Sequence, residues 1–212
     1  MIIMSRYPAG HKVATRARIL AASERLLKDR GVEGASVDAV MRAAGLTVGG
    51  FYGHFDSKEA LAREALLYGV ERSFARLTEG TDDLEPRAFL RALIHRYFAQ
   101  LDDPSLDDAC PLTLLLPDVA RGGDAFRTEF AMRTAALLAQ VEDRLPDVPG
   151  MSRRDVALAV FSALSGAVAM ARAAHTPRAQ ARIAGATEAL LERTFGLDAA
   201  ATPPPVLPRR GE

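Results

Sequence analysis

Three side chains that can bind phosphate oxygens lie close together in the sequence, at Tyr52, His54 and Lys58. A phenol, an imidazole and an ammonium group all donate hydrogen bonds, and the ammonium group adds a positive charge. Such donors are typical of contacts to a nucleic-acid backbone. Tyr52 could equally be a half-buried packing aromatic with an exposed hydroxyl group, and His54 an ordinary surface histidine. The residue types leave both interpretations open, so the elements around them must decide.

Catalytic and metal chemistry find little support in the sequence. The four histidines, His11, His54, His95 and His175, show neither metal-ligand spacing with acidic residues nor a neighbouring nucleophile. No glycine-rich phosphate loop followed by Lys and Ser or Thr is present. The single cysteine, Cys110, excludes an intrachain disulfide and a cysteine-cluster zinc site. We therefore expect no enzyme, no metal site and no cofactor.

Two adjacent glycines, Gly49 and Gly50, precede the phosphate-binding candidates in the stretch GLTVGGFYGHFDSKEAL, residues 45–61. Glycine costs roughly 1 kcal/mol per helix position relative to alanine, so two in one turn need a reason. The reason we infer is a backbone that must approach another surface closely.

Short helices joined by tight turns must position these residues. Apolar periodicity and capping residues predict four of them, over 13–30, over 37–44, over 48–54 and from Ser57 onward. A helix, a short helix, a three-residue turn and another short helix form the helix-turn-helix arrangement, whose second member enters the DNA major groove. The paired glycines would let the backbone of that second member lie directly against the DNA.

At these residues the chain resembles the TetR family of transcriptional repressors. The shared pattern runs through AAGLTVGGFYGHFDSKEAL and covers roughly the first quarter of the chain. The resemblance implies contacts with base edges by Thr47, Val48, Gly49, Gly50 and Phe51, and with phosphates by Tyr52, His54 and Lys58. Many members have a large or polar residue at the position of Gly53, so we expect sparse base readout with more weight on DNA shape. Phe55 and Leu61 are assigned to a small core beneath these residues, and Phe51 fits either role.

The composition predicts a globular chain. With 212 residues, 49% of them hydrophobic, it can bury a substantial core. We find neither an 18-residue apolar run nor a charged-then-apolar leader, so we expect no membrane partner and a cytoplasmic location. The formal net charge is zero, yet residues 1–55 contain eight basic and four acidic residues. That excess fits a DNA-binding region and equally well a mixed solvated surface.

Helical periodicity continues to residue 196, and no segment alternates as a strand would, so we predict an all-α fold. The last two segments, 152–174 and 177–196, are rich in small residues. The resemblance implies that they form a four-helix bundle with their copies in a second subunit, giving a homodimer through residues 152–196. An intramolecular helical hairpin is the alternative. A dimer is favoured because a two-fold DNA reader needs two recognition helices roughly 34 Å apart.

We predict three parts: a helix-turn-helix DNA-binding domain at 11–57, a helical ligand-binding and dimerisation domain at 58–197, and a proline-rich, disordered tail at 198–212. In the family, the middle helices enclose a pocket for a small, often apolar inducer that releases DNA. Core and pocket share an apolar composition, so sequence alone does not separate them. The candidate lining residues are Phe89, Leu93, Tyr97, Cys110, Leu114, Phe126 and Phe130, with His95 and Arg133 as possible polar groups.

Cys110 allows a second interpretation. A thiol at a helix N-terminus can have a lowered pKa and sense electrophiles, although the neighbouring Asp107 and Asp108 oppose that shift. A buried, unreactive thiol is the commoner outcome.

Together these features predict a ligand-responsive transcriptional repressor that binds a palindromic double-stranded DNA operator as a dimer and is released by an unidentified small-molecule inducer. A helical adaptor or an enzyme that has lost DNA binding are the alternatives. A steep fall of DNA affinity with salt would distinguish the repressor from both.

Overall fold

The computed structural model describes residues 9–102, 106 and 108–197, and every regular element among them is helical. The predicted all-α fold is therefore confirmed, while the predicted tail at 198–212 lies outside the described residues. The elements are α1 (Ala9–Gly34), α2 (Val37–Ala43), η1 (Val48–Gly53), α3 (Lys58–Thr78), α4 (Pro86–Ala99), α5 (Pro111–Arg121), α6 (Asp124–Ala139), η2 (Glu142–Arg144), α7 (Arg153–Arg172) and α8 (Pro177–Phe195).

The predicted helix boundaries near the N-terminus agree with the structure to within one residue, except for the first helix: α1 extends four residues beyond the predicted range of 13–30 at each end. The hydroxyl group of Ser36 accepts from the Ala39 backbone N–H at 3.2 Å, which caps α2. Ser57 caps α3 in the same way, through the Ala60 N–H at 3.0 Å. Gly31 breaks α1 with a φ of 69°, and a last helical turn continues beyond it. Glycine allows this break because it has no Cβ to clash in the left-handed region.

A small apolar core holds α1, α2, η1 and the start of α3 together. Its fully or nearly buried members are Ile19, Val40, Met41, Ala44, Phe51, Phe55 and Leu61. The predicted core positions of Phe55 and Leu61 are thereby confirmed.

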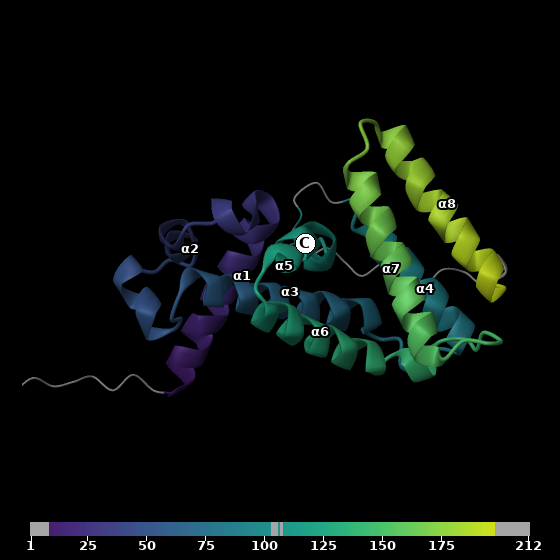
Figure 1. Ribbon diagram of the computed structural model, residues 1–212, viewed down its shortest axis with the longest axis horizontal. Coiled ribbons are helices and arrows are strands. Elements are labelled where there is room, and N and C mark those ends of the chain that lie inside the picture. The colour runs from purple at the N-terminus through teal and green to yellow at the C-terminus, as the bar shows by residue number, and fades with distance from the viewer. Residues whose placement is uncertain (1–8, 103–105, 107, 198–212) are drawn as a thin grey trace, which may run out of the picture.

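Helix α3 connects this N-terminal unit to the rest of the molecule (Figure 1). Its first turn contributes Leu61 to the N-terminal core, its middle packs Leu66 and Val70 against α1 and α5, and its end packs Phe74 into the largest core. The predicted domain boundary at residues 57 and 58 falls at the start of this shared helix, and it stays a prediction. A long shared helix can carry displacements from one unit to the other.

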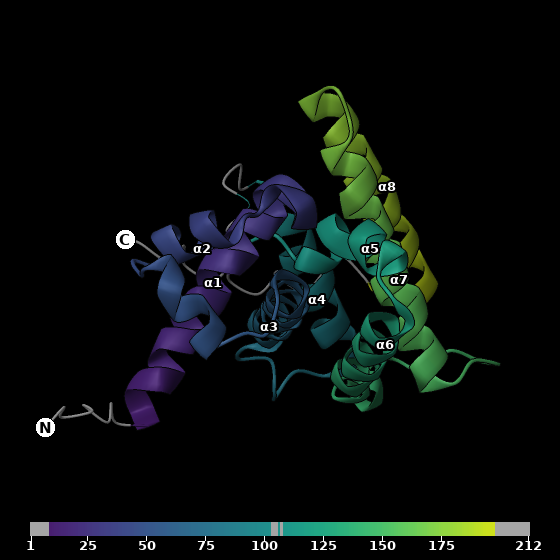
Figure 2. The ribbon, with the colours of Figure 1, turned by 60° about the vertical axis from the view of Figure 1, so that its left-hand side comes forward.

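Helices α7 and α8 lie side by side at the opposite end from α1 and α2 (Figures 1 and 2). The inner face of α7 is buried through Val156, Val160, Leu164 and Val168. Within the described ranges, α7 is also the one helix long and apolar enough to cross a membrane by length and composition, with 44% of that window buried inside the structure. The uncharged stretch of α7 runs over 16 residues, between Asp155 and Arg172, so the expectation that the chain has no 18-residue apolar run holds.

Candidate DNA-binding site and apolar cavity

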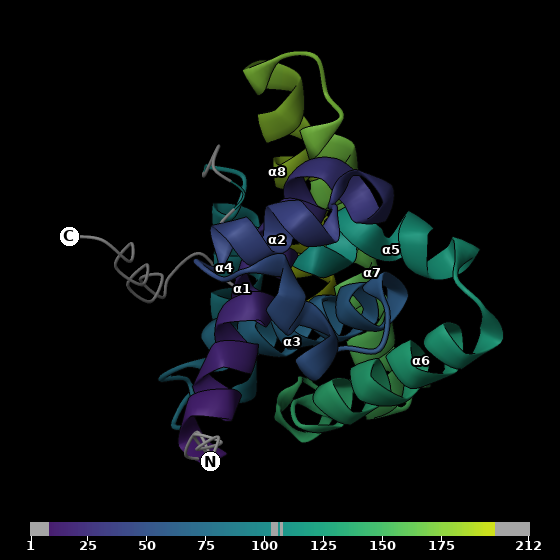
Figure 3. The same cartoon turned by 90° about the vertical axis from the view of Figure 1, so that its left-hand side faces the viewer.

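The segment 47–53 forms an exposed face at the end of the molecule built by α1 and α2, which Figure 3 views directly. Its short helix, η1, is a 3-10 helix rather than an α-helix. Val48 and Tyr52 are 44% and 76% exposed, and Thr47, Gly49 and Gly50 are exposed beside them. The structure therefore brings these five predicted contact residues together on the surface, and their contacts with DNA stay a prediction.

Phe51 is the exception on η1, because its side chain is 0% exposed. The ring stacks on Phe55 with 5.9 Å between centroids and meets the Tyr52 ring edge-on at 5.1 Å. Burying a phenyl ring here removes a large apolar area from water and fixes η1 on the core. The predicted base-edge contact of Phe51 is corrected: Phe51 anchors the face from below.

Neither backbone conformation nor close packing requires the glycines of this face in the described structure. A Cβ atom built on Gly49 or Gly53 would meet nothing within 4 Å, and one on Gly50 would make only an ordinary contact with Met41 Cε at 3.8 Å. None of the three has a positive φ. Alanine would therefore fit all three positions in the free protein, so the fold itself does not require glycine there.

His54 lies half-buried beside basic side chains of α1. Burial lowers the pKa of His54, and the positive charges of Lys12 and Arg16 lower it further. Its Nδ1 is buried and has no hydrogen-bond partner among the described residues. Lys12 and Arg16 were not among the predicted site residues, although their spacing of four places both on one face of α1. Sequence alone could not bring that face next to η1.

Lys58 is already engaged within the protein. Its Nζ donates a hydrogen bond to the Glu33 carbonyl oxygen at 2.9 Å, which ties the start of α3 to the end of α1. An ammonium group has three donors, so a phosphate contact would use those that remain.

A separate cavity of about 350 Å³ lies among α3, α4, α5, α6 and α7. Its described lining carries no charged side chain and consists of Val70, Phe74, Leu77, Tyr97, Cys110, Leu112, Leu116, Thr134, Leu137, Leu138, Leu158, Phe161, Ser162, Ser165 and Gly166. The size is at the lower end of the range for small-molecule sites.

Hydroxyl groups supply the polarity of this cavity. The Tyr97 hydroxyl and Ser165 Oγ form a hydrogen bond of 2.8 Å. Thr134 Oγ1 is buried and has no partner in the described part of the chain, so it is free to bind a guest. Burial raises the pKa of Tyr97 well above its usual value and raises that of the Cys110 thiol. The lowered thiol pKa considered for Cys110 is therefore corrected, and both groups are neutral at neutral pH.

Of the predicted pocket residues, the structure brings Tyr97 and Cys110 to this cavity and places the others elsewhere. Phe89 and Leu93 are wholly buried core residues, while Leu114, Phe126 and Phe130 pack against the α1, α3 and α5 cluster. Aromatic and aliphatic residues suit both a core and a pocket, which is why sequence reasoning chose them.

The predicted polar groups also lie outside the cavity. His95 lines a wider cleft of about 1390 Å³ between α1, α3, α4 and α8, where many charged side chains lie. Arg133 is exposed and pairs with Glu71 at 2.8 Å. The polar lining residues Thr134 and Ser165 were not identified from the sequence. Both lie in helices rich in small residues, where nothing in the sequence pattern distinguishes a cavity-lining hydroxyl group.

The N-terminal unit is the part of the chain that is similar in sequence to a known protein family. Residues 19–65, which contain η1 and its core, match the family model of bacterial regulatory proteins of the tetR family. This N-terminal part of the chain therefore has the sequence of a tetR-family protein.

Individual TetR-family relatives match over the N-terminal part. ArpR of Pseudomonas putida, described as an HTH-type transcriptional regulator, is 35% identical over 89 residues, which is 41% of this chain and 42% of the relative. The HTH-type transcriptional repressor KstR2 of Rhodococcus jostii is 32% identical over 92 residues, 43% of this chain and 45% of the relative. The matched part thus spans less than half the length of these curated relatives.

The similarity extends along the chain at the level of the fold. A TetR-family transcriptional regulator from Rhodococcus sp. superposes with a TM-score of 0.71 at 20% identity, over 86% of this chain and 99% of that one. At this identity the match concerns the helical architecture alone.

Proposed function

We propose that this TetR-family chain is a cytoplasmic, non-enzymatic transcriptional repressor that binds a palindromic double-stranded DNA operator as a homodimer and leaves it when a small molecule binds. The observation that carries the proposal is the exposed face at 47–53, whose glycines have no internal reason and which lies inside the family-matched range. A face free of bulky side chains suits close approach to the major groove.

Different residues of this face would serve affinity and specificity. Tyr52, His54 and Lys58 would hold phosphates. Thr47 Oγ1, which makes no capping hydrogen bond in the described structure, and the exposed Val48 would reach base edges. A valine side chain suits a thymine methyl group, the apolar feature of the major groove. The three glycines add no side-chain readout, so DNA shape would carry much of the specificity.

The proposed dimer interface, residues 152–196, exposes large apolar side chains on α7 and α8. Leu158, Met170 and Leu190 are 46%, 63% and 65% exposed. Their burial against a second copy would remove this apolar surface from water, which is the driving force for most protein association. Two copies would also supply the two recognition elements that a palindrome requires.

The proposed effector site is the apolar cavity. At roughly 30 Å³ for each atom with its share of space, about 350 Å³ admits on the order of a dozen non-hydrogen atoms. An uncharged, mainly apolar molecule fits this lining, because a charged guest would be buried without an ionic partner. Thr134 Oγ1 and the Tyr97–Ser165 pair would hydrogen-bond its polar group.

Selection of genomic fragments by the purified protein, followed by titration of the recovered duplex at several salt concentrations, tests the proposal. We expect enrichment of one palindromic site and a linear fall of log affinity with log salt, corresponding to several released counterions. Failure to enrich any site, repeated after removal of co-purified ligand, would overturn it in favour of a helical adaptor.

A further inference from the structure

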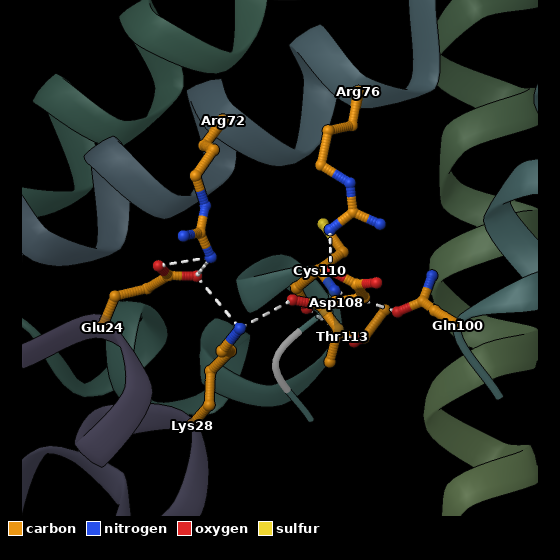
Figure 4. A network of polar contacts seen from close by, with 9 residues as sticks. Glu24, Lys28, Arg72, Arg76, Gln100, Asp108, Cys110 and Thr113 are labelled. Atoms are coloured by element: carbon orange, nitrogen blue, oxygen red, sulfur yellow. Dashed lines mark hydrogen bonds and ion pairs between the residues drawn. The ribbon is translucent and has the colours of Figure 1, made fainter. Parts of the chain in front are cut away.

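Buried polar groups join α1 of the N-terminal unit to the segment that begins α5 (Figure 4). Lys28 and Glu24 on α1 form an ion pair of 3.0 Å, with only 1% and 2% of their side chains exposed. Arg72 of α3 binds the other Glu24 carboxylate oxygen at 2.7 Å. Lys28 Nζ also donates to the Ala109 carbonyl oxygen at 3.3 Å. We call Glu24, Lys28, Arg72 and Ala109 the polar junction.

The polar junction is one residue away from the apolar cavity. Ala109 precedes Cys110, whose side chain lines the cavity. The Cys110 N–H donates to Gln100 Oε1 at 3.0 Å, and Gln100 Nε2 donates to the Tyr97 carbonyl oxygen at 2.6 Å. Thr113 Oγ1 holds the Cys110 carbonyl oxygen at 2.8 Å. The Ala109 carbonyl group and the Cys110 N–H belong to the same planar peptide group, so a guest that displaces the Cys110 backbone will also move the Ala109 carbonyl oxygen.

The helices around the polar junction are closely packed. A Cβ atom on Gly69 of α3 would lie 2.7 Å from Glu24 Cγ and 2.7 Å from Pro111 Cγ. Real Cβ atoms essentially never come so close to another heavy atom. The α3 backbone at Gly69 therefore lies in close contact with both α1 and the first residue of α5, and this region has no empty space into which either helix could move.

Burial makes the polar junction sensitive to small displacements. A buried ammonium group needs all of its partners, because loss of one leaves a desolvated donor unsatisfied. If the Ala109 carbonyl oxygen moves away, the Lys28 ammonium group loses the contact through which α1 reaches the start of α5. The hydrogen bond is therefore either made or lost, which is the behaviour of a switch element.

We propose that the polar junction transmits occupancy of the apolar cavity to the DNA-binding face: a guest displaces residues 109–112, Lys28 loses the Ala109 carbonyl oxygen, and α1 shifts with the Lys12 and Arg16 side chains that flank His54. This inference rests on the proposed function, since it assigns a route of regulation to the same cavity and the same face.

A large side chain introduced into the apolar cavity can take the place of the unknown effector and test this route from the cavity to the DNA-binding face. Thr134→Phe places a ring in the cavity, and Thr128→Phe, at an exposed position of the same helix α6, is its matched control. We expect Thr134→Phe to weaken binding to the selected operator at least about fivefold, the lower end of usual allosteric coupling factors. In the Lys28→Met background the same filling should change affinity less than about twofold. Amide hydrogen exchange of residues 109–113 should accelerate in Lys28→Met.

A second variant keeps the test decisive if Lys28→Met does not fold. Gly69→Ala forces α1 and α5 apart at the same place, whereas Gly123→Ala, at the start of α6 and outside the proposed dimer interface, adds a Cβ that meets nothing within 4 Å. We expect the effect of Thr134→Phe to shrink in Gly69→Ala and to persist in Gly123→Ala. Equal effects in all backgrounds, or no effect of filling in the parent chain, would overturn the route. Absence of any operator binding by the parent chain would instead overturn the proposed function.

Discussion

The glycines of the exposed face allow a prediction in which stability and DNA affinity change in opposite directions. In Gly49→Ala the new Cβ meets no atom within 4 Å, and the φ of residue 49 lies outside the left-handed region. The free protein should therefore gain stability, by about 0.4 to 1 kcal/mol, because alanine restricts the unfolded chain and favours the helix. For a chain of this size, 1 kcal/mol corresponds to a rise in Tm of about 2 to 4 °C.

The same methyl group should weaken DNA binding. It projects from the face that would lie against the groove, so the backbone must move away or the DNA must deform. A loss of about 1 to 3 kcal/mol is typical for one disturbed base position, which is about five- to 150-fold in Kd. Gly53→Ala should behave in the same way, since its Cβ also meets nothing within 4 Å.

Thermal unfolding and fluorescence anisotropy titration of the selected operator, at one salt concentration, measure the two effects. Gly123→Ala is the control, because it adds an unobstructed Cβ before α6, away from the exposed face and the proposed dimer interface, and should leave affinity unchanged. An unchanged operator affinity in Gly49→Ala would refute the argument that close approach explains the glycine. A lowered Tm would refute the claim that the fold itself does not need it.

Further variants test other parts of the molecule. Tyr52→Ala should weaken binding to all duplexes about equally, whereas Thr47→Ala should change the preferred sequence in a repeated selection. The pKa of His54 is lowered in the free protein, and a phosphate would raise it, so operator affinity should rise as pH falls from about 7.5 to 6; a flat profile would exclude the contact, and His54→Gln is the control. Leu190→Asp should halve the mass seen by sedimentation equilibrium, and a retained dimer would exclude this interface. Because burial raises the Cys110 thiol pKa, Cys110→Ser and the parent chain should respond alike to hydrogen peroxide in operator binding; a response confined to the parent would reinstate redox sensing.

Local signals accounted for much of the fold. Ser36 and Ser57 cap helices that begin where the sequence predicted them, Pro86 begins α4, and Pro177 begins α8. Caps and first-turn prolines act within three or four residues, so sequence alone specifies them. The end of α1 was less predictable, because Gly31 breaks the helix while Val32 beyond it packs against the α1, α3 and α5 cluster.

The two candidate sites differ in how many of their residues could be predicted from the sequence. The face at 47–53 is continuous in the chain, so its motif located the exposed residues directly. It left the role of Phe51 open between core and base contact, because the direction of that side chain depends on packing. The cavity combines side chains from five helices, and sequence reasoning placed Tyr97 and Cys110 there while missing Thr134 and Ser165.

The sequence by itself determined the helical class, the short-range turns and the family motif, because these depend on interactions between near neighbours in the chain. Only the tertiary structure decided which apolar residues surround a cavity rather than fill a core. It also placed the buried Lys28 against the Ala109 carbonyl oxygen, 81 residues away. Such pairings depend on how α1, α3 and α5 pack, and the same residue types would suit many other partners.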